Sequence, residues 1–394
     1  MNSQRETEAE GATPRRRRKR LRLAIAFVSL GVGIGLAEIL LRSVCPLTYK
    51  IYSGEGVLLD WRPSQPYGTR VSTLVWEVDF AETASTEDVE RWDRGTSIPD
   101  QQGTAIVRHT RLGWDCKPTL RAHKAVAWTR GRDLRILAVG DSFTFGSDVR
   151  WNESWPYQLQ EALPDSEVLN AGVPGYGVDQ VALKLEQLGE RLKPQVVVWG
   201  LVSYDVERAG RAWFPKSWMP KPVVEFKDGE MKVQPPRTRA EVIDSTRTWW
   251  KHSRVALALI AGVDVLRYAA WKEECTSLFA ELLQHSKAKV ESWGGELLLV
   301  YIPTGGPILR EDDQDGRGLM QTCAAAGVSF LDLRQSLRSL DLSQEALEGL
   351  TLKPGGRGHY TKRGNAYIAS LVAKELGSSK PGKSRENAQE EKDN

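Results

Sequence analysis

Hydrophobic and polar positions follow two different periods along residues 133–376. Short apolar runs that end at a turn are typical of buried parallel strands, whereas apolar positions at helical spacing indicate helices. The predicted strands are LRILAVG (134–140), SEVLNAG (166–172), PQVVVWGLV (194–202), GELLLVYIP (295–303) and GVSFLDL (327–333). Helical patterns lie at 153–163, 178–192, 275–294 and 361–376. This alternation predicts an α/β fold, a doubly wound five-stranded parallel sheet with helices on both faces.

A longer apolar run stands near the N-terminus. LAIAFVSLGVGIGLAEILL (23–41) has 19 residues and one charge, Glu38, and follows the basic stretch RRRRKRLR (15–22). As a helix it measures roughly 28 Å at ~1.5 Å per residue, about the hydrocarbon thickness of a bilayer. Basic residues before such a span retain that side in the cytoplasm.

The pattern therefore predicts a cytoplasmic basic tail at 1–22 and a transmembrane anchor at 23–42. The main domain would then be extracytoplasmic, and periplasmic in a Gram-negative cell. A cleaved signal peptide is the alternative.

An excursion at 203–247 interrupts the strand and helix pattern after the third predicted strand. Within it, KPVVEFKDGEMKVQPP predicts a hairpin that turns at Asp228 and Gly229. A doubly wound sheet places its ligand crevice at this edge, so the insertion is a candidate lid or substrate wall. Trp213 and Trp218 could stack on sugar rings of a substrate, or could simply pack.

Two further segments lack the regular pattern. Residues 46–130 are read as an irregular, β-rich N-terminal segment of short strands and loops. The polar stretch at 378–394 is predicted to be a disordered tail.

Charge and composition narrow the classes of partner. The formal net charge is +3 and residues 15–22 hold seven basic side chains, so the rest of the chain is mildly acidic. Nothing there indicates a nucleic-acid surface, and no nucleic-acid partner is expected.

Metal and cofactor chemistry is not indicated either. The four cysteines form no metal-binding pair, and the sequence leaves open whether they form disulfides or remain thiols: Cys45, Cys116, Cys275 and Cys323. Four histidines show no ligand spacing, and structural roles are expected for His109, His123, His252 and His285. We expect no metal and no cofactor.

Candidate chemistry begins at VGDSFTFG (139–146). The strand ends at Gly140, and Ser142 falls in the strand-to-helix turn, where a side chain can be exposed. Serine is a weak nucleophile until a base takes its proton. A Gly-Asp-Ser triplet alone is equally typical of a helix cap.

Other segments give this triplet a context. VGDSFTFG resembles the first sequence block of the SGNH hydrolases, also called GDSL esterases and lipases. VLNAGVPGYGVDQ (168–180) resembles the second block, and GHYTKRGNAYIA (358–369) resembles the last. LAEILLR (36–42) is similar to the anchor of membrane-bound members.

The resemblance covers 133–376 and implies a flavodoxin-like fold of the SGNH type. It implies that Ser142 is the nucleophile and His359 the base. It also implies that the backbone N–H groups of Ser142 and Gly175 bind the oxyanion.

Two positions depart from the family pattern. The third block reads GLVSYDV (200–206), with Tyr204 where the family has an oxyanion-binding asparagine. The family's acid lies shortly before the histidine, but Arg357 and Gly356 occupy those places. The phenol of Tyr204 can donate a hydrogen bond in place of the asparagine, and Asp205 is a possible acid. A Ser–His dyad and a loss of catalysis are the alternatives.

Together these features predict a single-pass, extracytoplasmic serine esterase that removes an acyl group, such as acetyl, from a cell-envelope glycan or lipid. The alternatives are an O-acyltransferase acting on an envelope polysaccharide and an inactive SGNH-fold protein that binds glycan or an assembly partner.

Overall fold

The computed structural model divides the chain into two compact units, which we describe separately. One unit comprises Met1–Thr83 and Ile243–Leu266, and the other comprises Ala84–Val242 and Arg267–Asn394. The structure describes residues 14–44, 98–99, 105–116, 128, 131–132, 134–209, 213–214, 219–236, 253–304, 314–338, 346, 349–353 and 357–378.

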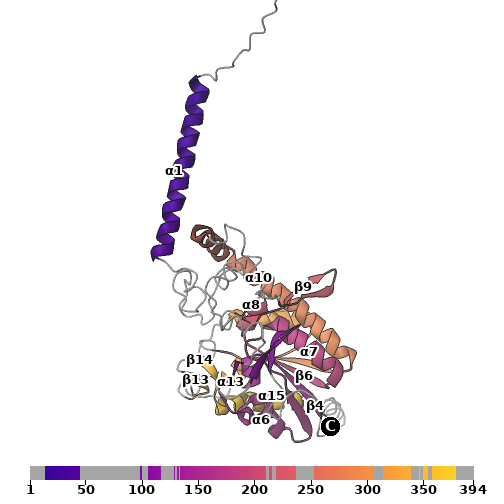
Figure 1. The fold of residues 1–394 in the computed structure, drawn as a ribbon. Coiled ribbons are helices and arrows are strands. Elements are labelled where there is room, and N and C mark those ends of the chain that lie inside the picture. The colour runs from indigo at the N-terminus through magenta and orange to yellow at the C-terminus, as the bar shows by residue number, and fades with distance from the viewer. Residues whose placement is uncertain are drawn as a thin grey trace, which may run out of the picture. The chain divides into compact units, whose positions relative to one another are not determined.

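The second unit is built on a parallel sheet in the order β12-β11-β6-β4-β5 (Figure 1). In chain order this is the flavodoxin-like arrangement 2-1-3-4-5, whose topological switch point lies between β4 and β6. The predicted five-stranded doubly wound sheet is confirmed. Its strands are β4 (Leu134–Gly140), β5 (Ser166–Asn170), β6 (Val196–Leu201), β11 (Glu296–Tyr301) and β12 (Ser329–Asp332).

Helices cover both faces of this sheet, because each face presents apolar side chains that must be buried. One core cluster joins the sheet to α7 (Val178–Leu192), α10 (Arg254–Ser292) and α12 (Gln314–Ala326). The opposite cluster joins it to α6 (Trp155–Ala162), α13 (Leu333–Arg338) and α15 (Lys362–Ser378).

Helix α10 begins well before the predicted 275. The added segment, from Arg254, has no proline and one glycine, so nothing in it stops a helix.

A small antiparallel sheet precedes the main one. It contains β1 (Ile98–Pro99), β2 (Ala105–His109) and β3 (Gly113–Cys116), with Trp114 fully buried. These strands belong to the segment predicted as β-rich, 46–130, most of which lies outside the described residues.

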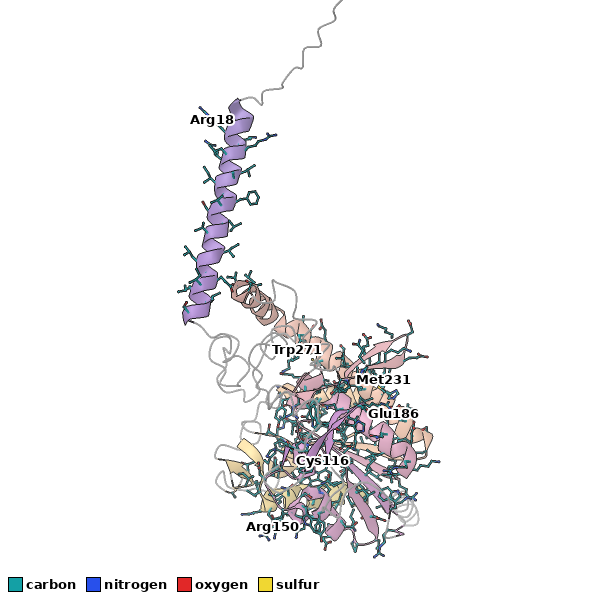
Figure 2. The ribbon with its side chains drawn as sticks, in the orientation of Figure 1. Arg18, Cys116, Arg150, Glu186, Met231 and Trp271 are labelled. Atoms are coloured by element: carbon teal, nitrogen blue, oxygen red, sulfur yellow. The ribbon has the colours of Figure 1, made fainter. Side chains whose placement is uncertain are left out.

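The insertion contains the predicted hairpin. Strands β9 (Val223–Lys227) and β10 (Glu230–Gln234) pair across a turn at Asp228 and Gly229, both with positive φ. Side chains of both strands pack on the α7 and α10 face of the core, including Met231 (Figure 2). A two-residue antiparallel pair precedes the hairpin, formed by β7 (Trp213–Phe214) and β8 (Met219–Pro220).

The first unit contains the long helix α1 (Pro14–Val44), with Arg18 near its beginning (Figure 2). Its stretch Arg18–Leu41 has a mean hydropathy of 2.2 and is long and apolar enough to cross a membrane; a signal sequence would meet the same criteria. The Glu38 carboxylate accepts hydrogen bonds from Ser253 Oγ at 2.9 Å and from Val255 N at 3.0 Å, at the start of α10. Beyond Ser378, the tail predicted to be disordered lies outside the described residues.

Candidate active site

Ser142 lies at the carboxyl end of the central strand β4. The strand ends at Gly140, and the short helix α5 (Ser142–Phe145) starts after Asp141, whose Oδ1 accepts a hydrogen bond from Phe143 N at 2.9 Å. A Cβ at Gly140 would lie 2.2 Å from Thr144 Oγ1, so only glycine permits this turn. The tight turn places the serine hydroxyl at the sheet edge.

The structure brings His359 and Ser142 together across more than two hundred residues of chain. His359 Nε2 lies 2.9 Å from Ser142 Oγ. On the other side of the ring, Nδ1 lies 2.6 Å from Asp148 Oδ2. If Nδ1 carries the ring proton and donates it to Asp148, Nε2 is left as the acceptor for the serine hydroxyl.

Asp148 is the functional residue that the sequence reasoning missed. It lies in the turn after α5, where Gly146 has a φ of 81° and Asp148 itself has a φ of 66°. Aspartate tolerates this left-handed conformation better than most residues. Asp148 stands in the same short stretch of sequence as Ser142, but no linear pattern shows that its side chain reaches His359.

Asp205 occupies a different place from the one proposed for it. Its Oδ1 accepts a hydrogen bond from Arg208 Nη1 at 2.7 Å, and its Oδ2 accepts one from Val202 N at 3.3 Å. Among the described residues, the carboxylate that contacts His359 is that of Asp148. The assignment of Asp205 as a possible acid is therefore corrected. Its carboxylate accepts hydrogen bonds from the turn after β6 and from Arg208.

Packing also fixes the orientation of His359. The residue lies in β14 (Arg357–Tyr360), and its ring lies 4.8 Å from the ring of Phe143, centroid to centroid. Tyr360 is buried, and its hydroxyl donates to the carbonyl of Pro303 at 2.8 Å. The imidazole of His359 is thus positioned by Phe143, which faces its ring, and by the buried Tyr360, which follows it in the chain.

Gly175 lies in the loop between β5 and α7, buried and with a φ of 82°. Strand β3 supports this loop on both sides of the glycine. Trp114 Nε1 donates to Pro174 O at 2.9 Å, and the Tyr176 hydroxyl donates to Trp114 O at 2.6 Å. The loop is also joined to the nucleophile strand, since Val173 N donates to Gly140 O at 3.0 Å. The oxyanion role of the Gly175 N–H remains a prediction.

Tyr204 begins α8 (Tyr204–Ala209), and its ring centre lies 4.6 Å from the guanidinium carbon of Arg208. This is the geometry of a cation–π contact. Its role as an oxyanion donor remains a prediction. Trp213 lies in β7, and Trp218 falls outside the described residues.

The remaining histidines and cysteines carry no sign of metal chemistry in the part of the chain that the structure describes. No cluster of three potential ligands occurs there. His109 Nδ1 accepts hydrogen bonds from Arg111 N and Leu112 N, which is a structural role. His285 lies 3.6 Å from Glu186. Cys116, Cys275 and Cys323 are thiols that are not joined in disulfides, whereas His123, His252 and Cys45 lie outside the described residues.

The fold and these contacts define a class of site: a Ser–His–Asp hydrogen-bonded chain at the carboxyl edge of a flavodoxin-like sheet, beside the switch point. A positioned base, a nucleophile in reach and an orienting acid are the parts that acyl transfer through serine requires.

Comparisons with solved structures found similar folds. A lipolytic protein of the G-D-S-L family from Desulfitobacterium hafniense matches with a TM-score of 0.36 and 15% identity, covering 61% of this chain and 99% of that one. A member of the same lipolytic family from Veillonella parvula matches with a TM-score of 0.37 and 12% identity, covering 61% and 97%. A catalytic mutant of an acetylxylan esterase from Geobacillus stearothermophilus matches with a TM-score of 0.38 and 16% identity, covering 63% and 95%.

No protein-family model matches the chain, and no curated protein matches it. The resemblance to SGNH hydrolases therefore rests on the sequence blocks of this chain and on the geometry of its site.

Proposed function

We propose that this protein is a membrane-anchored serine esterase of the SGNH type, acting outside the cytoplasm. The observation that carries the proposal is the contact chain Ser142 Oγ–His359 Nε2 and His359 Nδ1–Asp148 Oδ2, at 2.9 and 2.6 Å. It identifies Asp148 as an acid beside His359, which the sequence pattern did not indicate, and so favours a working enzyme over an inactive binding protein.

The reaction follows from the roles of the three side chains. Ser142 Oγ attacks the ester carbonyl carbon while His359 Nε2 takes its proton. The tetrahedral intermediate then expels the alcohol, which receives that proton from His359, and leaves an acyl group on Ser142. Water attacks the acyl-serine by the same route and releases the acid. Asp148 holds the imidazole and stabilises its positive charge.

The oxyanion would be bound by the backbone N–H groups of Ser142 and Gly175, with the phenol of Tyr204 as third donor. Donors of this kind accelerate acyl transfer because they stabilise charge that develops only in the transition state. The close support of the Gly175 loop by Trp114 favours a preformed site.

The substrate we propose is an acylated envelope glycan or lipid, with acetyl as one candidate acyl group. The His359 and Asp148 side chains are 23% and 43% exposed, so an ester on a large molecule can approach the base from solvent. The apolar helix α1 would retain the enzyme at the membrane, beside such substrates.

The test uses the purified full-length protein in detergent and an activated aryl acetate. We expect Ser142→Ala and His359→Ala each to remove nearly all turnover, and the double variant to add little, because residues that act as one unit are non-additive. Ser370→Ala is the matched control, since its hydroxyl lies on the exposed side of α15 and donates to the carbonyl of Tyr367 in the same helix.

Labelling by a serine-directed fluorophosphonate provides a second readout. Loss of labelling in Ser142→Ala alone would support the assignment. Wild-type protein with no Ser142-dependent turnover and no labelling would favour the binding-protein alternative. Acyl transfer to an added sugar hydroxyl in preference to water would favour the acyltransferase alternative.

A further inference from the structure

A buried arginine, Arg208, contacts the first three sequence blocks next to Ser142. Arg208 Nη1 lies 3.1 Å from Asp141 Oδ2, 2.7 Å from Asp205 Oδ1 and 2.8 Å from the carbonyl oxygen of Tyr176. The arginine side chain is 8% exposed and the two carboxylates are 1% exposed. One nitrogen therefore contacts the nucleophile turn, the Gly175 loop and the third block.

The hydroxyl of Ser142 has two acceptors in reach and one proton to donate. His359 Nε2 lies 2.9 Å from Ser142 Oγ, and Asp141 Oδ2 lies 3.2 Å from the same oxygen. Only a proton that points to His359 prepares the serine for attack. A carboxylate is the stronger acceptor, because hydrogen bonds to ionised groups are roughly twice as strong as neutral ones.

Arg208 contacts the same oxygen, Asp141 Oδ2, that competes for this proton. We infer that Arg208 is a positioning residue for the proposed reaction: its guanidinium occupies Asp141 Oδ2, so that the Ser142 hydroxyl donates to His359. The inference rests on the proposed function and adds a residue to it that the sequence blocks did not indicate.

The charges around the cluster are consistent with this role. Burial and the nearby Asp141 carboxylate raise the pKa of Asp205 well above its usual range, because two carboxylates at this spacing resist ionising together. Arg208 is the cation that touches both. Lys221 donates to the backbone carbonyl of Arg208 and pairs with Asp179, while Asp148 contacts Nδ1 of His359.

The experiment compares Arg208→Met, Arg208→Lys and the double variant Arg208→Met/Asp141→Asn. Arg208→Met removes the positive charge that contacts the Asp141 carboxylate, which then lies beside Ser142 without a cation. We expect kcat to fall about ten- to a hundredfold, the equivalent of one hydrogen bond to a charged group, with little change in KM. The acid limb of the pH dependence of kcat/KM should move to higher pH, because an added negative charge favours the protonated imidazole.

The other two variants separate charge from packing. Arg208→Lys keeps the positive charge, so its acid limb should stay near the wild-type position even if kcat falls. The double variant removes the competing carboxylate. Its acid limb of kcat/KM should therefore lie near the wild-type pH, and its kcat should be higher than that of Arg208→Met. Arg334→Met is the matched control, since Arg334 is an equally buried arginine paired with Asp332 on the far edge strand.

A measurement that does not depend on esterase activity tests this inference separately from the proposed function. The imidazole of His359 can be titrated by NMR, with His359→Gln used to assign its signal. We expect His359 to take up its proton at higher pH in Arg208→Met and at the wild-type pH in the double variant.

If wild type has no esterase activity but the titration behaves in this way, the proposed function fails, while the effect of Arg208 on the Ser142–His359 pair stands. A titration and a pH profile unchanged in Arg208→Met, or changed equally in Arg334→Met, would overturn the inference.

Discussion

Ser142 and Asp148 come from one turn, only six residues apart, although they contact opposite nitrogens of the same imidazole. Local backbone contacts set their spacing, since Gly146 N and Ser147 N both donate to the carbonyl of Ser142, at 3.1 and 3.0 Å. One turn therefore positions both Ser142 and Asp148, whereas His359 reaches them from a distant part of the chain.

The first residue-scale prediction concerns the acid. Asp148→Asn keeps the shape of the side chain but removes the charge that favours the Nδ1–H tautomer of His359. In a serine protease the equivalent change lowers kcat about 10⁴-fold, and because Asp148 is partly exposed we expect a smaller loss, on the order of 10²–10³-fold. The measurement is kcat on an aryl acetate. Asp165→Asn, in an exposed turn, is the control. An Asp148→Asn variant with nearly wild-type kcat would contradict the role of Asp148 and favour a Ser–His dyad.

The second residue-scale prediction concerns Tyr204. Tyr204→Phe removes only the hydroxyl and should lower kcat/KM tenfold or more, on the order expected for one lost oxyanion donor. Phenylalanine retains the ring that faces Arg208, so the cation–π contact serves as an internal control. A silent Tyr204→Phe with Ser142 still essential would mean that other groups complete the oxyanion hole.

The sequence predicted the pairing of Ser142 with His359 better than it predicted the residues that support this pair. Ser142 and His359 stand in recognisable blocks, and the structure joins them. Asp148 was missed because nothing in a linear pattern says that a turn in the left-handed conformation will aim a side chain at a strand two hundred residues away. Asp205 was favoured instead because it follows a strand at the right edge, but its burial beside Arg208 could not be seen.

At the scale of elements, the insertion is attached to the body by a buried ion pair. Lys221, 1% exposed, donates from Nζ to both carboxylate oxygens of Asp179, at 3.0 and 2.9 Å, and to the carbonyl of Arg208 at 2.6 Å. All three ammonium protons are satisfied. Together with the packing of the hairpin on the core, this favours the insertion as a fixed wall over a moving lid.

We predict that removing one member of the Lys221–Asp179 pair lowers the free energy of unfolding more than removing both. Lys221→Met leaves the Asp179 carboxylate buried without its cation and should lower the free energy of unfolding by about 3–5 kcal/mol. Urea unfolding at neutral pH measures the loss. Lys221→Met/Asp179→Leu replaces both charges and should recover most of it. Equal losses in the single and double variants would show that packing, and not the unpaired charge, governs stability there.

Elements with a strong pattern were predictable and irregular ones were not. Strand β4 and helix α7 begin and end where their patterns indicated, because both are bounded by turns and carry continuous apolar faces. The order of the strands was implied by the resemblance to the SGNH hydrolases, while the hydrophobic pattern itself indicated only a five-stranded parallel sheet. The support of the Gly175 loop by Trp114 was unforeseen, since a short strand in an irregular segment shows no period that links it to a distant loop.

At the scale of the whole molecule, the prediction concerns membrane topology. We expect one membrane pass by α1 with the basic N-terminus inside, as the positive charges before the apolar run indicate. Protease added to spheroplasts should digest the main domain, while a cytoplasmic marker protein stays intact. A protected main domain, or a mature soluble form that lacks the apolar helix, would contradict the anchor.

The wide separation of the base from the nucleophile has a consequence for the timing of synthesis. Ribosomes make Ser142 and Asp148 early and His359 late, in β14, just before the closing helix α15. A nascent or prematurely terminated chain would carry the nucleophile and the acid without a base. The proposed ester-cleaving activity would therefore begin only after β14 has been made and has placed His359 beside Ser142.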